Sequence, residues 1–224
     1  MNNEELVVFT KPKSAIAESI RTLRTNLQFT LVDKNIKTIM ITSSFPGEGK
    51  SFVSANLAAA FSTLGMKVLL MDCDLRRGRQ RKMFKLEERQ GLSNLLVDDI
   101  KNYKKYIRDT NIDNFDLLTS GTTSPNPSEL LGSEKNKEFM KKLREDYDLI
   151  IMDCPPANAV SDTLVLTEYA DEAVIVSAYK TTPFDLLLET KKTIESSNTK
   201  IAGVIINKMR QQGKKKYYYN SYYK

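Results

Sequence analysis

The sequence predicts an α/β fold, a mainly parallel sheet with helices on both faces. Short apolar runs rich in β-branched residues alternate with segments of helical periodicity, a pattern that favours parallel strands joined by helices. The first run leads through a glycine-rich loop, residues 44–51, directly into a helix. Two later runs end in an aspartate, Asp72 and Asp153, at the edge where open α/β sheets bind their ligands.

The predicted strands are the apolar β-branched runs, and the predicted helices are amphipathic segments before or between them. The strands expected are Thr38–Thr42, Val68–Met71, Phe115–Leu118, Leu149–Met152, Ala173–Val176 and Val204–Ile206. The helices expected include Ser14–Leu27, Ser51–Thr63 and Ser133–Glu145. Ser14 can cap the first helix. The apolar face of that helix should contain Ile16, Ile20, Leu23 and Leu27.

The domain boundary is expected at the end of the last strand. At 224 residues the chain can form one domain with a sizeable core. We expect that domain over residues 1–207, with the helix at about 14–27 at its N-terminus, and a flexible tail over residues 208–224. The tail carries basic residues and no acid, so the formal net charge of +6 belongs to it. Half of the ten tyrosines are also there, namely Tyr217, Tyr218, Tyr219, Tyr222 and Tyr223.

The absence of histidine excludes several kinds of enzyme. Neither a Ser-His-Asp or Cys-His nucleophile nor a His-ligated zinc is possible, and the His-Arg-Asp loop of eukaryotic-type kinases is missing. Acid–base chemistry would fall to carboxylates, Lys, Tyr or water. Cys73 and Cys154 have no metal-site or redox-pair spacing, which favours a reducing, cytoplasmic setting. Because no apolar run approaches the ~18–20 residues of a membrane span, any membrane association would be peripheral.

The loop Ser44-Phe-Pro-Gly-Glu-Gly-Lys-Ser51 has the strand, loop and helix context of a phosphate-binding loop. Its backbone N–H groups and the helix N-terminus would hold phosphate oxygens. Lys50 would neutralise the β- and γ-phosphates, and the Ser51 hydroxyl would bind Mg²⁺. The nucleotide contacts expected are Pro46, Gly47, Glu48, Gly49, Lys50, Ser51 and Phe52. Ser44 stands where the usual pattern has glycine, and a glycine-rich turn before an ordinary helix is the alternative.

Three aspartates are candidates for magnesium–phosphate chemistry. Asp72 and Asp74 would share one face if their strand continues, and both could then address one metal–phosphate centre. Asp153 ends another strand and would bind Mg²⁺ directly or through water. A single strand-terminal aspartate is more commonly a helix cap or turn former. The combination with a phosphate-binding loop favours the functional interpretation.

The chain resembles the bacterial tyrosine kinases of capsule and exopolysaccharide synthesis in three segments: the phosphate-binding loop, Asp72-Cys-Asp74-Leu-Arg-Arg and Asp153-Cys-Pro-Pro. Those kinases are P-loop NTPases of the deviant Walker type. The resemblance includes Glu18-x-x-Arg21-x-x-Arg24, Asn126-Pro-x-Glu-Leu-Leu131 and the tyrosine-rich end, so it spans nearly the whole chain. It is to the cytoplasmic kinase subunit that forms a separate polypeptide in Gram-positive bacteria. A Mg·ATP-dependent protein tyrosine kinase that autophosphorylates its C-terminal tyrosines and regulates polysaccharide synthesis is implied.

The resemblance also assigns roles. Asp72 corresponds to the candidate base on the tyrosine hydroxyl, with Lys50 and Asp74 as further catalytic residues. Ser51, Asp74 and Asp153 would be the magnesium ligands. The tail tyrosines would be the phosphoacceptors, and their neighbouring lysines would draw the tail toward a site rich in ATP phosphates. Two alternatives exist for the tail: it binds an anionic membrane or another acidic surface, or it is a non-native extension. Asn207 matches a position that contacts adenine in related ATPases, or it is a strand-end turn residue.

The partners implied are a membrane-spanning polysaccharide co-polymerase adaptor that activates the kinase, further copies of this chain in a ring, protein tyrosine substrates and a cognate phosphotyrosine phosphatase. No nucleic acid is expected. The chain would be cytoplasmic and peripheral to the membrane through its adaptor. Glu18, Arg21 and Arg24 lie along one side of the N-terminal helix and would link subunits, with a solvated helix face as the alternative.

Two questions stay open. The rival function is a nucleotide-switch ATPase, like the partitioning and septum-positioning ATPases, that positions a partner at the membrane. Phe45 stands where that class has a signature lysine. The basic segment Arg76–Lys82 departs from the kinase family at Gly78 and Arg81, where Pro and His are more usual. It is either a solvated basic helix or a contact to phosphates or a neighbouring subunit.

Overall fold

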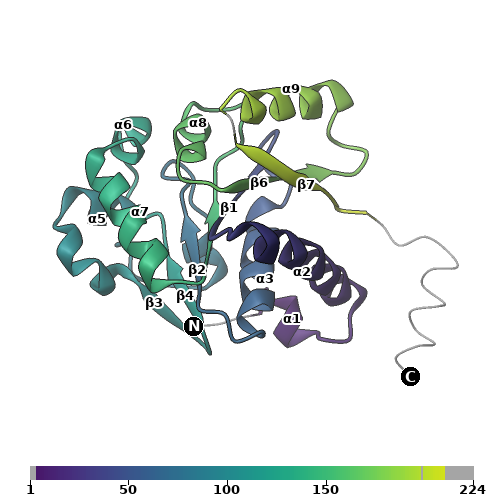
Figure 1. Cartoon of the computed structure of the whole chain (residues 1–224), viewed down its shortest axis with the longest axis horizontal. Helices are drawn as coiled ribbons and strands as arrows, with labels where there is room; N and C mark the ends of the chain where they lie inside the picture. The colour runs from purple at the N-terminus through teal and green to yellow at the C-terminus, as the bar shows by residue number, and fades with distance from the viewer. Residues whose placement is uncertain (1–3, 198, 210–224) are drawn as a thin grey trace, which may run out of the picture.

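The centre of the molecule is a seven-stranded sheet in the order β3-β4-β2-β5-β1-β6-β7 (Figure 1). The computed structural model describes residues 4–197 and 199–209. Its strands are β1 (Thr38–Ser43), β2 (Val68–Asp72), β3 (Arg108–Ile112), β4 (Phe115–Leu118), β5 (Leu149–Asp153), β6 (Glu172–Ala178) and β7 (Lys200–Asn207). Neighbouring strands pair in parallel except β3, which runs antiparallel to β4 at one edge. The predicted mainly parallel sheet is confirmed.

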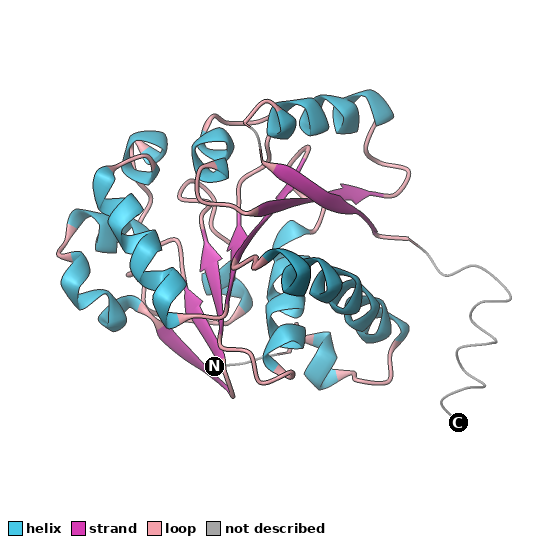
Figure 2. Ribbon diagram, viewed as in Figure 1, coloured by secondary structure: helices cyan, strands magenta, loops and turns pink. Residues whose placement is uncertain are grey.

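Helices cover both faces of this sheet (Figure 2). One layer contains α1 (Val7–Thr10), α2 (Ala15–Lys34) and α3 (Lys50–Ser62). The opposite layer contains α5 (Leu92–Val97), the 3₁₀ helix η1 (Ile100–Tyr106), α6 (Pro127–Leu131), α7 (Glu134–Asp146), α8 (Asp162–Thr167) and α9 (Phe184–Glu195). The short α4 (Gln80–Met83) follows β2. The α/β class with helices on both faces is therefore as predicted.

Alternation along the strands produces two separate cores. In β2, Val68 and Leu70 pack on the side of α2 and α3, whereas Leu69 and Met71 pack on the side of α7. Both faces are covered, so the central strands are buried at every position, and β2 and β5 are apolar at each position up to their terminal aspartate. Truncating a fully buried residue such as Leu70 to alanine would cost about 2–5 kcal/mol.

Every predicted strand is present, but the edges of the sheet were harder to predict. β7 begins at Lys200, earlier than the predicted Val204, because an edge strand with half-exposed alternate residues lacks a continuous apolar run. β3 was not predicted, because its sequence Arg-Asp-Thr-Asn-Ile is polar and its strand geometry comes from pairing with β4. Tertiary pairing outweighs local propensity at such edges.

The N-terminal helix α2 is capped as predicted, but its inner face differs in its first turn. The backbone N–H of Ala17 donates to Ser14 Oγ at 3.1 Å. Ile20 and Leu27 are buried, whereas Ile16 is 55% exposed, so the prediction that Ile16 joins the apolar face is wrong. The inner stripe starts at the fully buried Ala17, one position along, which turns Ile16 about 100° away from it.

Candidate active site

The carboxyl ends of β1, β2 and β5 meet at one edge of the sheet. β1 leads into the loop 44–49 and then into α3, which begins at Lys50. β2 and β5 are in register so that Asp72 pairs with Asp153, which places their two carboxylates at the ends of neighbouring strands. Ligands of open α/β sheets bind at this edge. The predicted loop and the predicted acids are therefore brought together.

Two glycines give the loop its conformation. Gly47 and Gly49 have φ values of +86° and +96°, in the left-handed region that glycine adopts without a steric penalty. A Cβ added to Gly49 would lie 2.1 Å from Nδ2 of Asn207, so a side chain there would displace the Asn207 amide. The loop consequently presents backbone rather than side chains, followed directly by the N-terminus of α3, an arrangement suited to phosphate oxygens.

The side chains of Glu48 and Asn207 hold the phosphate-binding loop in place through hydrogen bonds. The Glu48 carboxylate accepts hydrogen bonds from the backbone N–H of Phe45 at 2.8 Å, from that of Ala178 at 3.1 Å and from the Thr182 hydroxyl. Asn207 Nδ2 donates to the Glu48 carbonyl at 2.8 Å. Both residues were predicted to contact the nucleotide, yet neither side chain lines the pocket. Their side chains join the loop to the ends of β6 and β7.

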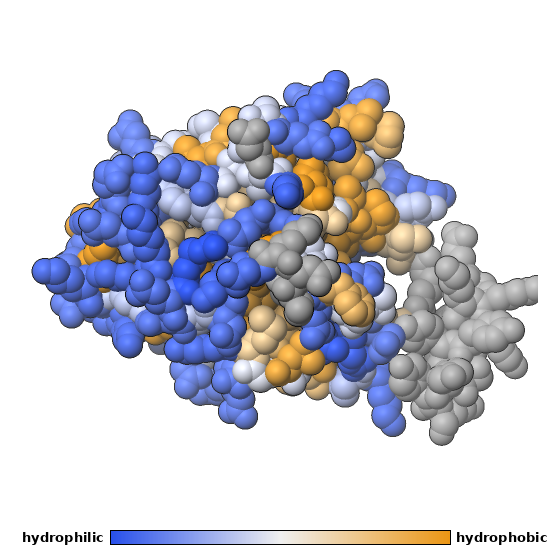
Figure 3. Space-filling view, viewed as in Figure 1, coloured by the Kyte–Doolittle hydropathy of each residue, from blue (hydrophilic) through white to orange (hydrophobic). Residues whose placement is uncertain are grey.

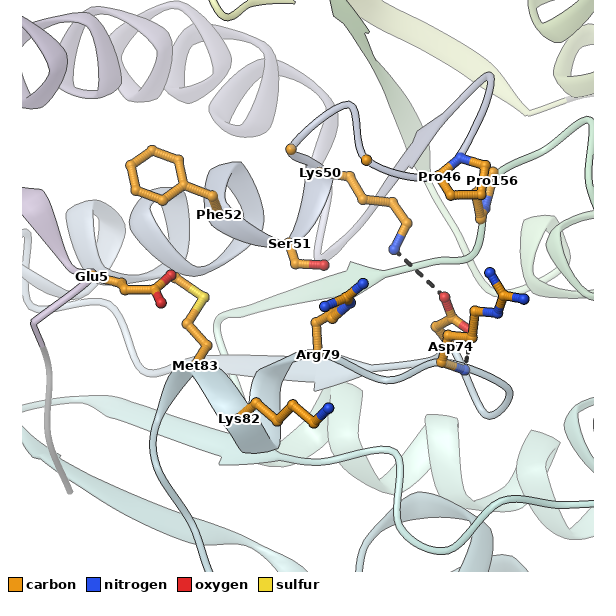
Figure 4. Close-up of a pocket in the computed structure, with 13 residues that line it drawn as sticks. Glu5, Pro46, Lys50, Ser51, Phe52, Asp74, Arg79, Lys82, Met83 and Pro156 are labelled. Atoms are coloured by element: carbon orange, nitrogen blue, oxygen red, sulfur yellow. Dashed lines mark hydrogen bonds and ion pairs between the residues drawn. The ribbon is translucent and has the colours of Figure 1, made fainter.

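Lys50 lies between two carboxylates. Its Nζ is 3.5 Å from Asp153 Oδ1 and 3.7 Å from Asp74 Oδ2, and all three side chains are almost fully buried. Burial by itself would lower the pKa of Lys50, but the charges of Asp153 and Asp74 outweigh it and raise that pKa above its ordinary value. The ammonium group therefore stays charged at the centre of the site (Figure 4).

Asp72 is fully buried beside this centre. Burial first, and then the charge of Asp153, raise the pKa of Asp72 to about 8, although the N–H of Gln80 opposes this shift. β2 ends at Asp72, so strand alternation does not carry Asp74 to the same face. A turn does so instead, in which the Asp74 N–H donates to Asp72 Oδ1 at 3.2 Å.

Gln80 is a site residue that the sequence analysis missed. Its side-chain Nε2 donates to Asp153 Oδ2 at 2.8 Å and to the Ser51 carbonyl at 3.1 Å, and its backbone N–H donates to Asp72 Oδ2 at 3.0 Å. It is fully buried, and its Oε1 has no hydrogen-bond partner in the part of the chain that the structure describes. No sequence signal pointed to it, because it stands within a run of arginines and lysines.

These residues fit a magnesium ion. The Ser51 hydroxyl and the carboxylates of Asp74 and Asp153 are oxygen donors of the kind Mg²⁺ prefers, and Lys50 already places a positive charge between the two carboxylates. Within residues 4–197 and 199–209, no group of three or more acidic or thiol side chains could hold a metal by itself. A magnesium ion here would therefore complete its coordination with nucleotide and water oxygens.

A cavity of about 350 Å³ opens over this centre. Of the predicted residues, Pro46, Gly47, Gly49, Lys50, Ser51, Phe52 and Asp74 line it. Asp72 and Asp153 lie beneath its surface. Arg77, Arg79 and Lys82 of the basic segment, for which a phosphate contact was one of the alternatives, also line it. Glu5, Met83 and Pro156 complete the lining and were not predicted as site residues. The tail tyrosines Tyr217, Tyr218, Tyr219, Tyr222 and Tyr223 lie outside the residues that the structure describes.

The charged stripe on α2 has contacts within its own chain. Arg21 pairs with Glu18 at 2.6 Å and donates to the Pro12 carbonyl. Arg24 donates to the Ala60 carbonyl at 3.2 Å and to Thr63 Oγ1 at 3.1 Å. The Arg24 cation is thus placed at the C-terminus of α3, where the helix dipole favours positive charge. An intermolecular role would be additional to these contacts.

The fold and the site define a P-loop nucleotide-binding protein, and the AAA domain family matches residues 36–203. The chain is 39% identical to tyrosine-protein kinase YwqD of Bacillus subtilis over 90% of this chain and 85% of that one. The solved chimerical protein CapA2B2 superposes with a TM-score of 0.88 at 36% identity, over 94% of this chain and 92% of that one. The kinase domain of Escherichia coli tyrosine kinase ETK gives 0.88 at 31% identity, covering 96% and 84%. The chain belongs to the bacterial tyrosine-protein kinases of the capsule and exopolysaccharide type.

Family membership favours the kinase over the nucleotide-switch alternative. The septum site-determining protein MinD of Pyrococcus horikoshii, solved with Mg-ADP, has a TM-score of 0.64 at 24% identity, over 76% of this chain and 69% of that one. That likeness extends to the fold alone.

None of the helices within the described ranges is long and apolar enough to cross a membrane.

Proposed function

We propose that the protein transfers the γ-phosphoryl group of Mg·ATP to its own C-terminal tyrosine cluster. The observation that supports this most strongly is the position of Lys50. It sits at the start of α3, between Asp74 and Asp153 and next to the buried Asp72. A phosphate-binding loop, a central cation and a buried carboxylate with a raised pKa are what phosphoryl transfer to a phenol needs when no histidine is present.

In this reaction the bond between the γ-phosphorus and the β–γ bridging oxygen of ATP breaks, and a bond from that phosphorus to the tyrosine oxygen forms. The products are ADP and phosphotyrosine, and the phenolic proton passes to Asp72 or to water. The loop amides and Lys50 would hold and neutralise the phosphates. When bound to Ser51, Asp74 and Asp153, Mg²⁺ supplies charge neutralisation on the transferring phosphate.

Asp72 is the candidate proton acceptor. The carboxyl pKa of Asp72, about 8, is close to the operating pH. A pKa in this range suits a general base better than the pKa of an ordinary aspartate does. Gln80 and the Asp74 N–H fix both oxygens of this carboxylate. Bound Mg²⁺ would lower the pKa again, and Asp72 would then orient the phenol more than remove its proton early.

The end of the described chain supports the tail as acceptor. Lys208 Nζ donates to the Gly47 carbonyl at 2.6 Å, so the chain leaves β7 directly beside the phosphate-binding loop. We propose residues 1–207 as the catalytic unit and residues 208–224 as the acceptor tail. Transfer would occur between neighbouring subunits of a homo-oligomeric ring, with Glu18, Arg21 and Arg24 at the interface.

We further propose an adaptor partner and a role in regulating capsule or exopolysaccharide synthesis. The chimerical protein CapA2B2 supports association with a CapA-type membrane adaptor, which would place this chain at the inner side of the membrane. Apolar surface gathers over α9 and the edge strand β7 (Figure 3), where Phe184, Val204 and Ile206 are exposed. The surface includes β7, and Asn207, the last residue of this strand, donates a hydrogen bond to the phosphate-binding loop. The kinase would also phosphorylate tyrosines of other proteins, and a cognate phosphotyrosine phosphatase would remove the phosphate groups.

A mixing experiment tests the kinase activity and its transfer between subunits. The acceptor is the Lys50→Met chain with an intact tail, and the donor is a chain whose five tail tyrosines are phenylalanine. With Mg·ATP and the adaptor's cytoplasmic segment, mass spectrometry should find phosphotyrosine in the acceptor tail. Phosphate release without phosphotyrosine in that tail would contradict the proposal.

A further inference from the structure

The basic segment Arg76–Lys82 divides into two groups with different contacts. Arg76 is used structurally, because Nε and one terminal nitrogen donate to the two Asp162 oxygens at 2.8 Å and 3.0 Å. Arg81 is used likewise and donates to the Leu86 carbonyl at 3.0 Å. The remaining cations, Arg77, Arg79 and Lys82, have no side-chain partner in residues 4–197 and 199–209. All three are exposed.

These three unpaired cations line the same cavity as the phosphate-binding loop. Arg79 and Lys82 lie on the segment that faces Ser51, with Arg79 directed toward the centre of the pocket (Figure 4). Asp74, one of the two acids among the lining residues, is already paired with Lys50. Glu5, the other acid, lies apart, beside Phe52 and Met83 (Figure 4). The pocket therefore has a cationic rim on the side opposite the loop.

The rim is separate from the groups that suit the nucleotide. Phosphates of ATP would be held by the loop amides, the N-terminus of α3 and Lys50, which belong to residues 44–51. Arg77, Arg79 and Lys82 come from a different segment, between β2 and the end of α4. Three close, unpaired positive charges repel one another, and an anion with more than one charge relieves that repulsion. Arginine is well matched to phosphate, since its planar group can form two parallel hydrogen bonds.

The anion that fits both the rim and its surroundings is phosphotyrosine. It carries a charge of about −1.5 to −2 near neutral pH. The half-buried Phe52 and Met83 beside the rim offer apolar contacts to a tyrosine ring. Tail tyrosines stand next to one another in the sequence, so a modified residue would lie within a few ångströms of the next acceptor. The unmodified tail, by contrast, is basic and gains nothing from this rim.

We propose that Arg77, Arg79 and Lys82 bind a phosphotyrosine of the acceptor segment while a neighbouring tyrosine enters the active site. The enzyme then prefers acceptors that already carry phosphotyrosine, and modification of the cluster accelerates once the first group is added. This rests on the proposed function for the identity of the acceptor. It revises the expectation that the tail lysines draw the unmodified tail toward the active site, because the rim is itself positive.

The test compares two synthetic peptides spanning residues 214–224, one unmodified and one phosphorylated at Tyr222. The full-length protein is used as wild type, as R77Q/R79Q/K82Q, and as the control R89Q/K101Q/K141Q, which removes equal charge from exposed positions outside the pocket. Binding of each peptide is measured by fluorescence anisotropy without ATP. Phosphorylation of each is measured with Mg·ATP and the adaptor segment, and ADP affinity and thermal unfolding are measured in parallel.

We expect wild type and control to bind the phosphorylated peptide at least about tenfold more tightly than the unmodified one, and to favour it similarly in kcat/KM. In R77Q/R79Q/K82Q both ratios should fall to about one. Equal binding of the two peptides by wild type would overturn the proposal. So would a triple variant that loses ADP affinity but keeps the peptide preference. If neither peptide is phosphorylated, the proposed function fails, while the binding comparison still decides whether the rim recognises phosphotyrosine.

Discussion

The side-chain amide of Gln80 donates a 2.8 Å hydrogen bond to Asp153 Oδ2, and the same nitrogen donates to the Ser51 carbonyl at 3.1 Å. One buried glutamine thereby connects a proposed magnesium ligand to the backbone of the residue that supplies another. Partners of this kind orient the ligands of a metal, and their removal typically weakens metal affinity or activity 10–100-fold.

Gln80→Leu should therefore raise the Mg²⁺ concentration needed for tight nucleotide binding about tenfold or more, because Asp153 loses its orienting donor. A fluorescent ADP analogue titrated at several Mg²⁺ concentrations measures this without turnover. Gln90→Leu, at an exposed position, is the matched control. If Gln80→Leu and wild type show the same Mg²⁺ dependence, Gln80 has no orienting role.

The raised pKa of Asp72 predicts how the stability of the metal-free protein depends on pH. The folded state holds the Asp72 proton up to about pH 8, whereas the unfolded state releases it near pH 4, the ordinary range. Stability from this group is therefore full below about pH 4, falls as the pH rises and is lost by about pH 8. Asp72→Asn cannot titrate, so its Tm relative to wild type should increase from pH 5 to pH 8.

Thermal unfolding in the presence of a chelator, at three pH values across that window, measures the effect. Asp113→Asn, at an exposed position, serves as the control and should track wild type. A Tm difference between Asp72→Asn and wild type that stays constant from pH 5 to pH 8 would show that Asp72 titrates normally.

Glu48 is a structural residue in this account, despite its place in the phosphate-binding loop. Its buried carboxylate joins the loop to β6 through the N–H groups of Phe45 and Ala178. Hydrogen bonds to charged groups contribute about 1.5–3 kcal/mol, so Glu48→Ala should lower the free energy of unfolding by roughly that amount. Chemical denaturation measures it, with Glu87→Ala as an exposed control. Unchanged stability in Glu48→Ala would be inconsistent with this role.

Substitution of Arg24 distinguishes a structural role from an interface role for the charged residues of α2. Because it donates to the Ala60 carbonyl and Thr63 Oγ1 at the end of α3, Arg24→Ala should destabilise even a dilute monomer by about 1–2 kcal/mol. Asn26→Ala, at an exposed position of the same helix, should not. An Arg24→Ala protein with wild-type stability but altered assembly would assign this residue to the interface alone.

The site positions that the sequence could predict are those fixed by local pattern. The loop glycines, Lys50, Asp72 and Asp153 follow apolar strands, and the strand ends of a parallel sheet must converge. Gln80 could not be predicted, since its role depends on a turn that returns the chain from β2 toward β5. The same turn directs Arg79 and Lys82 into the pocket, whereas sequence alone could not separate them from Arg76 and its partner Asp162.

Glu48 and Asn207 have a structural role that the motif did not predict. Their positions in the motif and at a strand end suggested nucleotide contacts, but both side chains turn inward to support the loop. A motif gives the order of residues, while the direction of each side chain depends on the φ values on either side of it. Positive φ values at Gly47 and Gly49 bracket Glu48.

The most direct test of phosphoryl transfer to the tail is the intact mass of the full-length chain before and after incubation with Mg·ATP and the adaptor's cytoplasmic segment. We predict mass increases by whole phosphoryl groups in wild type, located by fragmentation to Tyr217, Tyr218, Tyr219, Tyr222 and Tyr223. Lys50→Met and a variant with phenylalanine at all five positions should show none in the tail. ATP consumption by wild type with an unchanged mass would contradict the account.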